Sequence, residues 1–411
     1  MKETNVLAVI DIKQQLGKYQ AIPASELVSE LKYIPLETCS DCLVGEQLID
    51  IFVTSTHIFI EGSSYCYAFG RDGKFIGKIG RIGHGPGEYN NLIGMTVDEN
   101  KKFLYLETYL NLLEYSWDGK FHRSIPLPPK ADGTLKTVTF VRDGSFIGHI
   151  QNNTGKEKYN FLLFNDSGQV IKSYDNHVFL DRPRQRYMPT DWAMRPFRME
   201  DRIYVKEIWN DTMYYLNEQN NLIPEFVFNL DKYAFRKEMR EDATDQGYMK
   251  TDGIILIPYE WLPMVGIPDH IFFSMNVFDA STFDISFPEK PQREISIPAG
   301  VQSVRAVDGR RPLGLYDVVN QQTQLLDTDP ISRLSGLIND LDGGLSFWPR
   351  HYTSDNELVD IWQAYDMKGF LTDEYFNAHQ IKDPAAHQRL KAIVKELKDD
   401  DNPVIVIGKL K

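Results

Sequence analysis

Cysteine is scarce in this sequence, and its placement gives little support to a metal site. The 411 residues contain three cysteines, Cys39, Cys42 and Cys66, and an odd number cannot form a complete set of disulfides. Cys39 and Cys42 form a C-x-x-C pair, but no second such pair and no paired histidines follow to complete a zinc site. Residues 34–53 favour a strand, a turn and another strand, whereas a thioredoxin-type redox site needs a strand and then a helix. We therefore expect one strained disulfide or free thiols near a strand end.

Basic residues and long apolar runs are also lacking. Lys and Arg number 45 against 58 Asp and Glu, which gives a net charge of −13. No basic stripe offsets this acidity, so a groove for nucleic-acid phosphates is not expected. No run of 18 apolar residues occurs, so no transmembrane span is expected. The N-terminal apolar stretch ends at Asp11 and is too short for a secretory signal. The protein is therefore cytoplasmic, or the segment that exports it is missing from this sequence.

The first half of the sequence does contain a repeat of thirteen residues. Each copy is an apolar or aromatic run, a polar turn and a second run. The copies are Tyr67–Ile79, Leu113–Ile125, Leu162–Tyr174 and Tyr214–Phe226. Their turn residues, Gly73, Gly119, Gly168 and Asn220, are spaced 46, 49 and 52 residues apart. A period of this size indicates stacked supersecondary units, here with one hairpin in each unit.

The residues at the turns have a physical reason. A short hairpin loop needs positive φ at one or both central residues, and Gly and Asn adopt this conformation most readily. The flanks are rich in Tyr, Phe and Ile, as half-buried strands are. A degenerate fifth copy at Leu315–Leu325, with Gln322 and Thr323 at its turn, lies about two periods after Asn220. The repeat thus extends, less regularly, into the second half.

Four short strands per unit, closed by a tight hairpin, are typical of a β-propeller blade. The first four units cover residues 48–79, 93–125, 137–174 and 197–228. We expect the fifth over about 250–330, with strands near Ile254–Ile257, Ile271–Met275, Phe283–Phe287 and Leu315–Val319. The last unit contains strands at Leu345–Trp348, Leu358–Ala364 and Pro403–Lys409. The expected fold class is all-β: a six-bladed propeller of four-stranded antiparallel blades with helical insertions in the C-terminal half.

Three segments favour helix over strand. Ala24–Leu31 is a candidate short helix, and Asp231–Gln246 is charged and free of Pro and Gly, which predicts a helix inserted between blades. Pro384–Lys398 has helical spacing, with Pro near its start and basic residues toward its end. We expect this last helix inside an insertion that covers Asp373–Asp400.

The two ends of the chain are expected to meet in one sheet. Asn402–Lys411 has the pattern of a strand, and a ring of blades left open would expose unpaired sheet edges. We therefore predict that residues 403–411 pair with the N-terminal strand of residues 31–37. On this view residues 1–30 lead into the ring, and residues 31–411 form a single propeller domain.

The loop Gly80–Tyr89 (GRIGHGPGEY) is the most distinctive local string. As a crossover between blades, it uses Gly for unusual backbone angles and close approach. As a ligand-binding loop, it would present Arg81, His84, Glu88 and Tyr89 at one face of the ring. It lacks the Gly-Lys-Ser/Thr ending of a phosphate-binding loop, and no helical pattern follows it. The crossover interpretation is favoured, and surface binding is the alternative.

A second candidate site is the acidic cluster at Asn339–Gly344. Asn339, Asp340 and Asp342 can place oxygens around Ca²⁺, the one cofactor considered for this chain. The cluster lacks the Glu at the twelfth position of a helix–loop–helix calcium site. A plain Asp-Gly turn is therefore the favoured interpretation, and a cation site is the alternative.

Residues Asp72–Tyr89 resemble a motif of the six-bladed β-propeller proteins of Bacteroidetes, which are relatives of the NHL-repeat propellers. Tyr33–Thr38 (YIPLET) and the last twelve residues (DDNPVIVIGKLK) support the resemblance by their position, and it covers roughly residues 25–411. It implies six blades and an extracytoplasmic, often lipid-anchored, position at the cell envelope. No lipoprotein signal is present, so export is implied by the resemblance alone. The family supplies no catalytic residues to assign here.

No catalytic motif is evident in the sequence. It contains no G-x-S-x-G elbow, no H-E-x-x-H and no P-loop. Large aromatic residues mostly bury their area, so a core position is favoured over sugar stacking for Trp192, Trp209, Trp261, Trp348 and Trp362. We expect a monomeric, non-enzymatic binding or scaffold module for a protein or glycan at the cell surface. The alternative is a carbohydrate-active lyase or hydrolase with its site at the central channel, assembled from loops of different blades.

Overall fold

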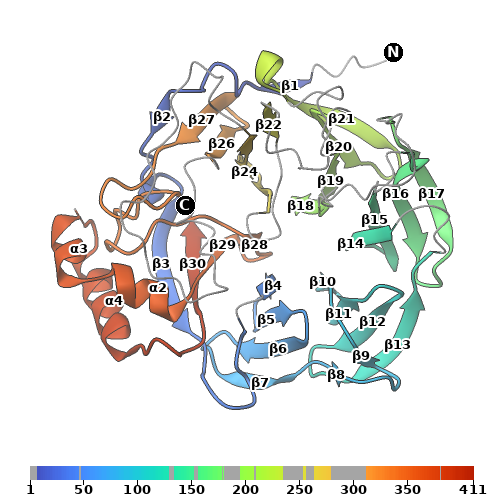
Figure 1. Ribbon diagram of the computed structural model, residues 1–411, viewed down its shortest axis with the longest axis horizontal. Helices are drawn as coiled ribbons and strands as arrows, with labels where there is room; N and C mark the ends of the chain where they lie inside the picture. The colour runs from blue at the N-terminus through green and yellow to red at the C-terminus, as the bar shows by residue number, and fades with distance from the viewer. Residues whose placement is uncertain are drawn as a thin grey trace.

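The computed structural model describes residues 7–45, 48–128, 134–151, 156–177, 179, 195–207, 210–234, 253–255, 263–278, 312–379 and 381–411. Within these residues six small antiparallel sheets are arranged around a central axis, as Figure 1 shows. The chain is therefore a six-bladed β-propeller, as the hairpin repeat predicts. The few helices lie mainly near the C-terminus and cover the outside of one blade.

The first three blades follow the predicted units closely. Blade one contains β4 (Leu48–Val53), β5 (His57–Gly62), β6 (Tyr65–Gly70) and β7 (Phe75–Lys78). Blade two contains β10 (Gly94–Asp98), β11 (Phe103–Glu107), β12 (Asn111–Ser116) and β13 (Phe121–Pro126). Blade three contains β14 (Thr134–Arg142), β15 (Ser145–Gln151), β16 (Tyr159–Asn165) and β17 (Val170–Asp175). Between blades one and two, β8 (Arg81–Ile82) and β9 (Glu88–Tyr89) form a small parallel pair.

The other three blades include strands from the N-terminal segment. Blade four contains β18 (Phe197–Met199), β19 (Arg202–Lys206), β20 (Thr212–Leu216) and β21 (Leu222–Phe228), with β1 (Ala8–Ile10) added in parallel. Blade five contains β23 (Val265–Ile267), β24 (His270–Ser274), β26 (Leu313–Asp317) and β27 (Gln322–Leu326), with β2 (Tyr19–Gln20) added in parallel. Blade six contains β28 (His351–Tyr352), β29 (Glu357–Trp362), β30 (Val404–Leu410) and β3 (Val28–Pro35).

The repeated turn residues join neighbouring blades as well as reversing the chain. Gly73, Gly119, Gly168 and Asn220 all have positive φ, as the repeat predicts. A Cβ at Gly73 would lie 2.2 Å from the carbonyl oxygen of Pro35, on the outer strand of blade six. A Cβ at Gly168 would lie 2.3 Å from the carbonyl oxygen of Pro126, on the outer strand of blade two. Glycine is therefore required at these two turns by both conformation and contact.

The C-terminal strand pairs with β3, from the N-terminal part of the chain, in blade six. β30 lies between β29 and β3 and is antiparallel to both, with Ile405 opposite Ile361 on one side and Ile34 on the other. The apolar side chains of β30 are buried on both faces of the blade. One face packs with blade one and the other beneath the helical insertion. This strand pairing converts a row of sheets into a ring without exposed edges at the junction.

The N-terminal segment does more than lead into the ring. β1 and β2 extend blades four and five, and Ile10, Ile12 and Leu16 are buried in the core between those blades. The helix predicted at Ala24–Leu31 is wrong, because only a single 3-10 turn forms at Ala24–Glu26 before β3 begins. Pairing with β30 outweighs the helical preference of those few residues.

Blade five was predicted least well. Ile254 lies in a separate two-stranded pair, β22 (Gly253–Ile255) with β25 (Asn276–Phe278), and not in the blade. The fifth hairpin exists as β26 and β27, but Gln322 and Thr323 lie in the second strand, opposite Asp317 and Tyr316. The positive φ falls at Gln321 instead. The strand predicted at Phe283–Phe287 lies outside the described residues.

Two further predictions differ from the structure. Leu345–Trp348 is not a strand, and the innermost strand of blade six is instead β28. Of the helix predicted at Asp231–Gln246, the described part forms only a 3-10 turn, η2 (Asp231–Tyr233), and residues 235–246 lie outside the described residues. Trp348 and Trp362 are buried, as predicted for aromatic core residues. Trp192, Trp209 and Trp261 lie outside the described residues.

The helical insertion packs on blade six. The predicted helix is confirmed as α4 (Pro384–Glu396), which begins with Pro at its first turn and with the Asp383 carboxylate accepting from the backbone N–H of Ala386. It is accompanied by α2 (Ala364–Phe370) and α3 (Asp373–Ala378), which were not predicted. All three helices share a core with the face of blade six that packs toward blade five.

An ion pair fastens this insertion to the segment between blades five and six. His379 donates from Nε2 to Oδ2 of Asp329 at 3.0 Å and from Nδ1 to the carbonyl of Tyr375 at 2.8 Å. Because both ring nitrogens face acceptors, the imidazolium is the favoured form. Burial opposes this charge, but the Asp329 carboxylate and the carbonyl of Tyr375 together outweigh burial and raise the pKa of His379 above its ordinary value.

This ion pair predicts a pH-dependent stability. Because the pKa of His379 is raised in the folded state, the ion pair contributes its full stabilisation below the unfolded-state pKa of about 6.5. This contribution is lost as pH rises through the folded-state pKa. The free energy of unfolding of the parent, minus that of His379→Gln, should therefore fall as pH rises above about 6.5. His379→Ala should cost roughly 1.5–3 kcal/mol below pH 6. Denaturant unfolding at several pH values measures both, and a pH-independent difference would contradict the assignment.

Ring closure predicts a second result. Deleting residues 403–411 removes four buried apolar side chains of β30, Val404, Ile405, Val406 and Ile407. At roughly 1.5–3 kcal/mol each, their loss is comparable with the whole stability of a domain, about 5–15 kcal/mol. The truncated chain should lack a cooperative thermal transition by circular dichroism. A control lacking residues 1–10 loses β1, the outermost strand of blade four, with the one buried apolar side chain of that strand, Ile10, and should keep a cooperative transition. A truncated chain that melts at the parent temperature would refute the role of β30.

Candidate functional site

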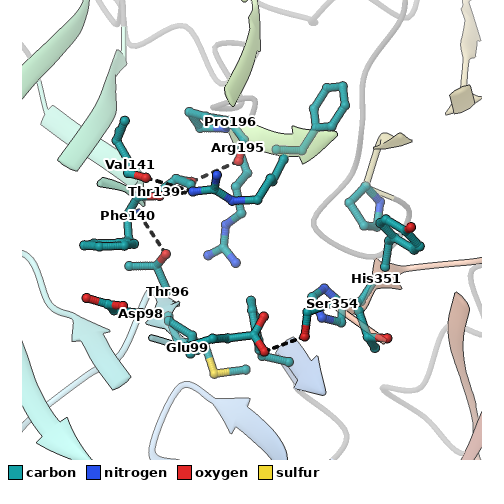
Figure 2. A pocket seen from close by; sticks show the side chains of 18 of the residues that line it. Thr96, Asp98, Glu99, Thr139, Phe140, Val141, Arg195, Pro196, His351 and Ser354 are labelled. Carbon is teal, nitrogen blue, oxygen red and sulfur yellow. Dashed lines mark hydrogen bonds between the residues drawn. The ribbon is translucent and has the colours of Figure 1, made fainter. Parts of the chain in front are cut away.

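The inner strands of the six blades enclose a central cavity. Residues of β4, β10, β14, β18, β23 and β28 line it, and its volume is about 940 Å³. Figure 2 shows side chains from several blades converging on this space. A volume at the upper end of the range for small-molecule sites makes this cavity the first candidate for ligand binding.

One end of the cavity is crossed by an ion pair. Arg195 precedes β18 in blade four, and its Nη1 donates to the carboxylate of Asp50 on β4 in blade one, on the opposite side of the ring. Figure 2 shows the side chain of Arg195 extending into the cavity. Both side chains are partly exposed, at 28% for Arg195 and 20% for Asp50. A Cβ at Gly94 would lie 2.4 Å from Nη2 of Arg195, so glycine at this point of β10 leaves room for the guanidinium.

The other end of the cavity is rich in carboxylates. Five of them lie at or just after the ends of inner strands: Asp98, Glu99, Asp143, Glu200 and Asp201. Glu99 accepts a hydrogen bond from the hydroxyl of Ser354 at 2.8 Å, which joins blade two to blade six. Burial raises the pKa of Glu99 above its ordinary value.

The walls between these ends are held by ordered polar contacts. The hydroxyl of Thr96 accepts from the backbone N–H of Phe140 at 2.8 Å, and the hydroxyl of Thr139 donates to the carbonyl of Pro196 at 2.9 Å. Arg198 donates to the carbonyl of Val141 at 2.8 Å. Figure 2 shows these bonds linking blades two, three and four around the cavity. The inner strands are therefore fixed against one another before any ligand enters.

His351 is an unsuitable proton acceptor in its present position. Its Nε2 donates to the carbonyl of Val53 at 3.2 Å, and its ring lies against Phe52 with centroids 4.3 Å apart. Desolvation lowers the pKa of His351 well below neutrality. The imidazole is therefore neutral at pH 7 and held by the backbone. Within the described residues, no group of three His, Cys, Asp or Glu side chains is arranged to hold a metal ion.

The Gly80–Tyr89 loop lies at the outer rim between blades one and two, beside β7 and β13 (Figure 1). Arg81 and Glu88 meet in an ion pair at 2.6 Å, and Glu88 also accepts from the backbone N–H of Gly85 at 2.8 Å. The bond from Gly85, with that from Arg81, lowers the pKa of Glu88. Tyr89 is buried and donates to the carbonyl of Ile79 at 3.2 Å, whereas His84 is exposed. Arg81 and Glu88 therefore meet at the surface and Tyr89 packs inward, and ligand binding by this loop stays a prediction.

The second candidate cluster lies beneath the helical insertion. Asp342 accepts from the hydroxyl of Tyr33 at 3.0 Å and from the amide of Asn339 at 2.8 Å. Asp340 accepts from Lys382 at 2.8 Å and from the hydroxyl of Ser25 at 2.5 Å. Burial raises the pKa of Asp342. These contacts join the N-terminal segment, blade six and the insertion, and a calcium site here stays a prediction.

The cysteines are structural in this arrangement. Cys39 and Cys42 form a disulfide in the segment between β3 and β4. Cys66 is a buried free thiol on β6, and burial raises its pKa well above the ordinary value. A raised pKa keeps the thiol protonated and unreactive at neutral pH.

Comparison with known protein families identifies a family that matches this sequence. A family described as a domain of unknown function, DUF4934, matches residues 7–409. The chain belongs to the DUF4934 family. Among curated proteins, none matches the sequence. The description of the family assigns no activity, so membership alone does not indicate what the protein does.

Several solved structures are similar to this DUF4934 chain to different degrees. A Bacteroides fragilis protein described as exported is 16% identical with a TM-score of 0.67, over 98% of this chain and 99% of its own. A DUF4221 protein from Bacteroides vulgatus is 8% identical with a TM-score of 0.39, over 72% of this chain and 85% of its own. The extracellular domain of a Bacteroides thetaiotaomicron two-component system is 10% identical with a TM-score of 0.36, over 72% of this chain and 29% of that one. In the described part of the present chain, no helix is long and apolar enough to cross a membrane.

Sequence reasoning missed the residues that face the cavity. Asp50, Arg195, Glu99 and Ser354 belong to four different blades and carry no motif. Their common signal is position, because each lies at or near an end of the first strand of its unit. Those ends border the channel in a propeller. A search for polar residues at these positions would have found all four.

Proposed function

We propose that this DUF4934 propeller is a non-enzymatic, extracytoplasmic binding module that takes part of a glycan or protein into its central cavity. The observation that carries the proposal is the cavity itself. It has the size of a ligand site, its walls are fixed by hydrogen bonds between blades, and partly exposed charged groups lie at both ends. Residues 31–411 would act as one monomeric domain, related to the NHL-repeat propellers, with residues 1–30 as an accessory segment.

The protonation of the polar groups in the cavity and their hydrogen-bond partners favour binding over catalysis. His351 is neutral and bonded to the backbone, Asp50 is paired with Arg195, and Glu99 is bonded to Ser354. A general base must lie within hydrogen-bond reach of the proton that it removes, and its pKa must lie near the operating pH. The ring of His351 is bonded to the backbone carbonyl of Val53, and its pKa lies well below neutrality. The second candidate, a carbohydrate-active lyase or hydrolase, is supported by the convergence of arginine and carboxylate side chains on the same cavity.

The proposed location is the cell envelope. The B. fragilis structure with the same fold along its whole length is described as exported. The Cys39–Cys42 disulfide is of a kind that persists in oxidising compartments. We place the protein in the periplasm or at the outer-membrane surface, as a lipoprotein.

Blocking the cavity tests the binding proposal. Asn100 lines the cavity and is exposed at the turn after β10, so Asn100→Trp should fill the opening without disturbing the core. In a screen of glycans and peptides by thermal shift and calorimetry, a ligand of the parent should bind this variant at least about tenfold more weakly. Gln219→Trp, an exposed turn residue outside the cavity lining, is the matched control. Equal affinity in parent and Asn100→Trp, or no ligand at all, counts against the proposal.

Cell fractionation tests the location. In its native host, the product of the natural gene should be found in the envelope fraction and should incorporate a labelled fatty acid. Recovery of the protein wholly in the cytosol would contradict the extracytoplasmic proposal. Recovery in the periplasm without label would contradict the lipid anchor alone.

A further inference from the structure

We infer that the cavity ligand is a short acidic saccharide, with a uronic-acid carboxylate held by Arg195 in place of Asp50 and neutral sugar hydroxyls directed at the carboxylate-rich end. This inference rests on the proposed function and names its ligand class. Two features carry it: a guanidinium that reaches into the cavity at one end, and carboxylates that outnumber the basic side chains at the other.

Arg195 differs from the other arginines of the lining in what it contacts. Arg350 is paired with Asp360 at 3.7 Å, outside the lining, and Arg198 donates to the carbonyl of Val141. Arg142 donates to the carbonyl of Asn217 and to the side chain of Asn220. Arg195 instead spans the channel to Asp50, and both partners belong to the lining. A ligand that enters this end meets the pair directly.

The pairing of Arg195 with Asp50 identifies the anionic group that fits. A guanidinium is planar and presents paired N–H donors that match a carboxylate. Asp50 already supplies a carboxylate at this point, so a ligand carboxylate can replace it with bonds of the same kind. Asp50 also accepts from the backbone N–H of Ile51 at 2.9 Å and is partly exposed, so water can solvate it once it is displaced. Asp50 therefore acts as an internal competitor for the ligand.

The opposite end requires hydroxyl donors instead of a second anion. Its five carboxylates are Asp98, Glu99, Asp143, Glu200 and Asp201, and they outnumber the basic side chains beside them, Lys101, Arg142 and Arg198. This excess of negative charge disfavours a continuous polyanion. The bond from Ser354 to Glu99 is an alcohol donating to a carboxylate, which is the contact that a sugar hydroxyl makes. Phe52, His351 and Tyr352 line the wall with aromatic rings, against which pyranose rings can pack. One acidic sugar followed by neutral sugars satisfies both ends.

The test compares three probes of similar size by calorimetry. The first is a disaccharide of glucuronic acid linked to a neutral hexose, the second is the same disaccharide with its carboxylate reduced to an alcohol, and the third is a dipeptide with free termini. The parent should bind the acidic disaccharide about 10- to 100-fold more tightly than the reduced one. The dipeptide should not bind in the cavity.

Two substitutions separate a binding role for Arg195 from a structural one. Arg195→Gln should weaken the acidic disaccharide about 10- to 100-fold and leave the reduced disaccharide unchanged. Asp50→Asn removes the competitor and should tighten the acidic disaccharide roughly threefold or more. Arg202→Gln is the matched control, because Arg202 is paired with Glu225 outside the cavity lining. Melting temperatures of all variants report whether the ring is intact.

Three outcomes would overturn the inference. The first is equal binding of the acidic and reduced disaccharides, and the second is tighter binding of the dipeptide. The third is loss of acidic-disaccharide binding in a folded Asp50→Asn variant, which would make the ion pair a structural element. If neutral glycans still bind and Asn100→Trp abolishes that binding, the inference fails while the proposed function stands. If nothing binds in the cavity, both fail.

Discussion

Closure of the ring is the constraint on which the rest of this structure depends. Each blade buries its faces against its neighbours, so the cores lie between blades and not within them. β30 completes this arrangement by pairing with β29 and with β3 from the other end of the chain. Without that strand, blade six would lose its central pairing, and the faces of blades one and six that meet there would be exposed. The pairing of β3 with β30, which are farther apart in sequence than any other paired strands in the described residues, thus supports the local strand pairings within the blades.

Packing between blades also accounts for the residues that repeat. The turn glycine of one blade touches the last carbonyl of the preceding blade's outer strand, as at Gly73 against Pro35 and Gly168 against Pro126. A side chain at either position would push two blades apart. The repeated residues are therefore those needed to reverse the chain and to pack one blade against the next. Because structure alone requires them, they carry little information about function.

The cavity follows from the same geometry. Six inner strands converge on one axis, polar groups lie at both ends of the channel, and hydrogen bonds between blades run along its wall. An ion pair spans one end and a carboxylate cluster lines the other. The candidate loop at Gly80–Tyr89 lies at the outer rim and the cluster at Asn339–Gly344 beneath the helices, so both join parts of the chain and neither lines the axis.

The sequence by itself determined the fold class, the four regular hairpins, the C-terminal strand and helix α4, because these depend on alternation, turn residues and caps within a few positions of one another. It misplaced the strands of blade five, where short strands are separated by long segments, and the helix at Ala24–Leu31, where pairing with β30 decided. Only the tertiary structure decided the site. Arg195 and Asp50 are 145 residues apart and carry no motif. They meet because the ring places blades one and four on opposite sides of one narrow channel.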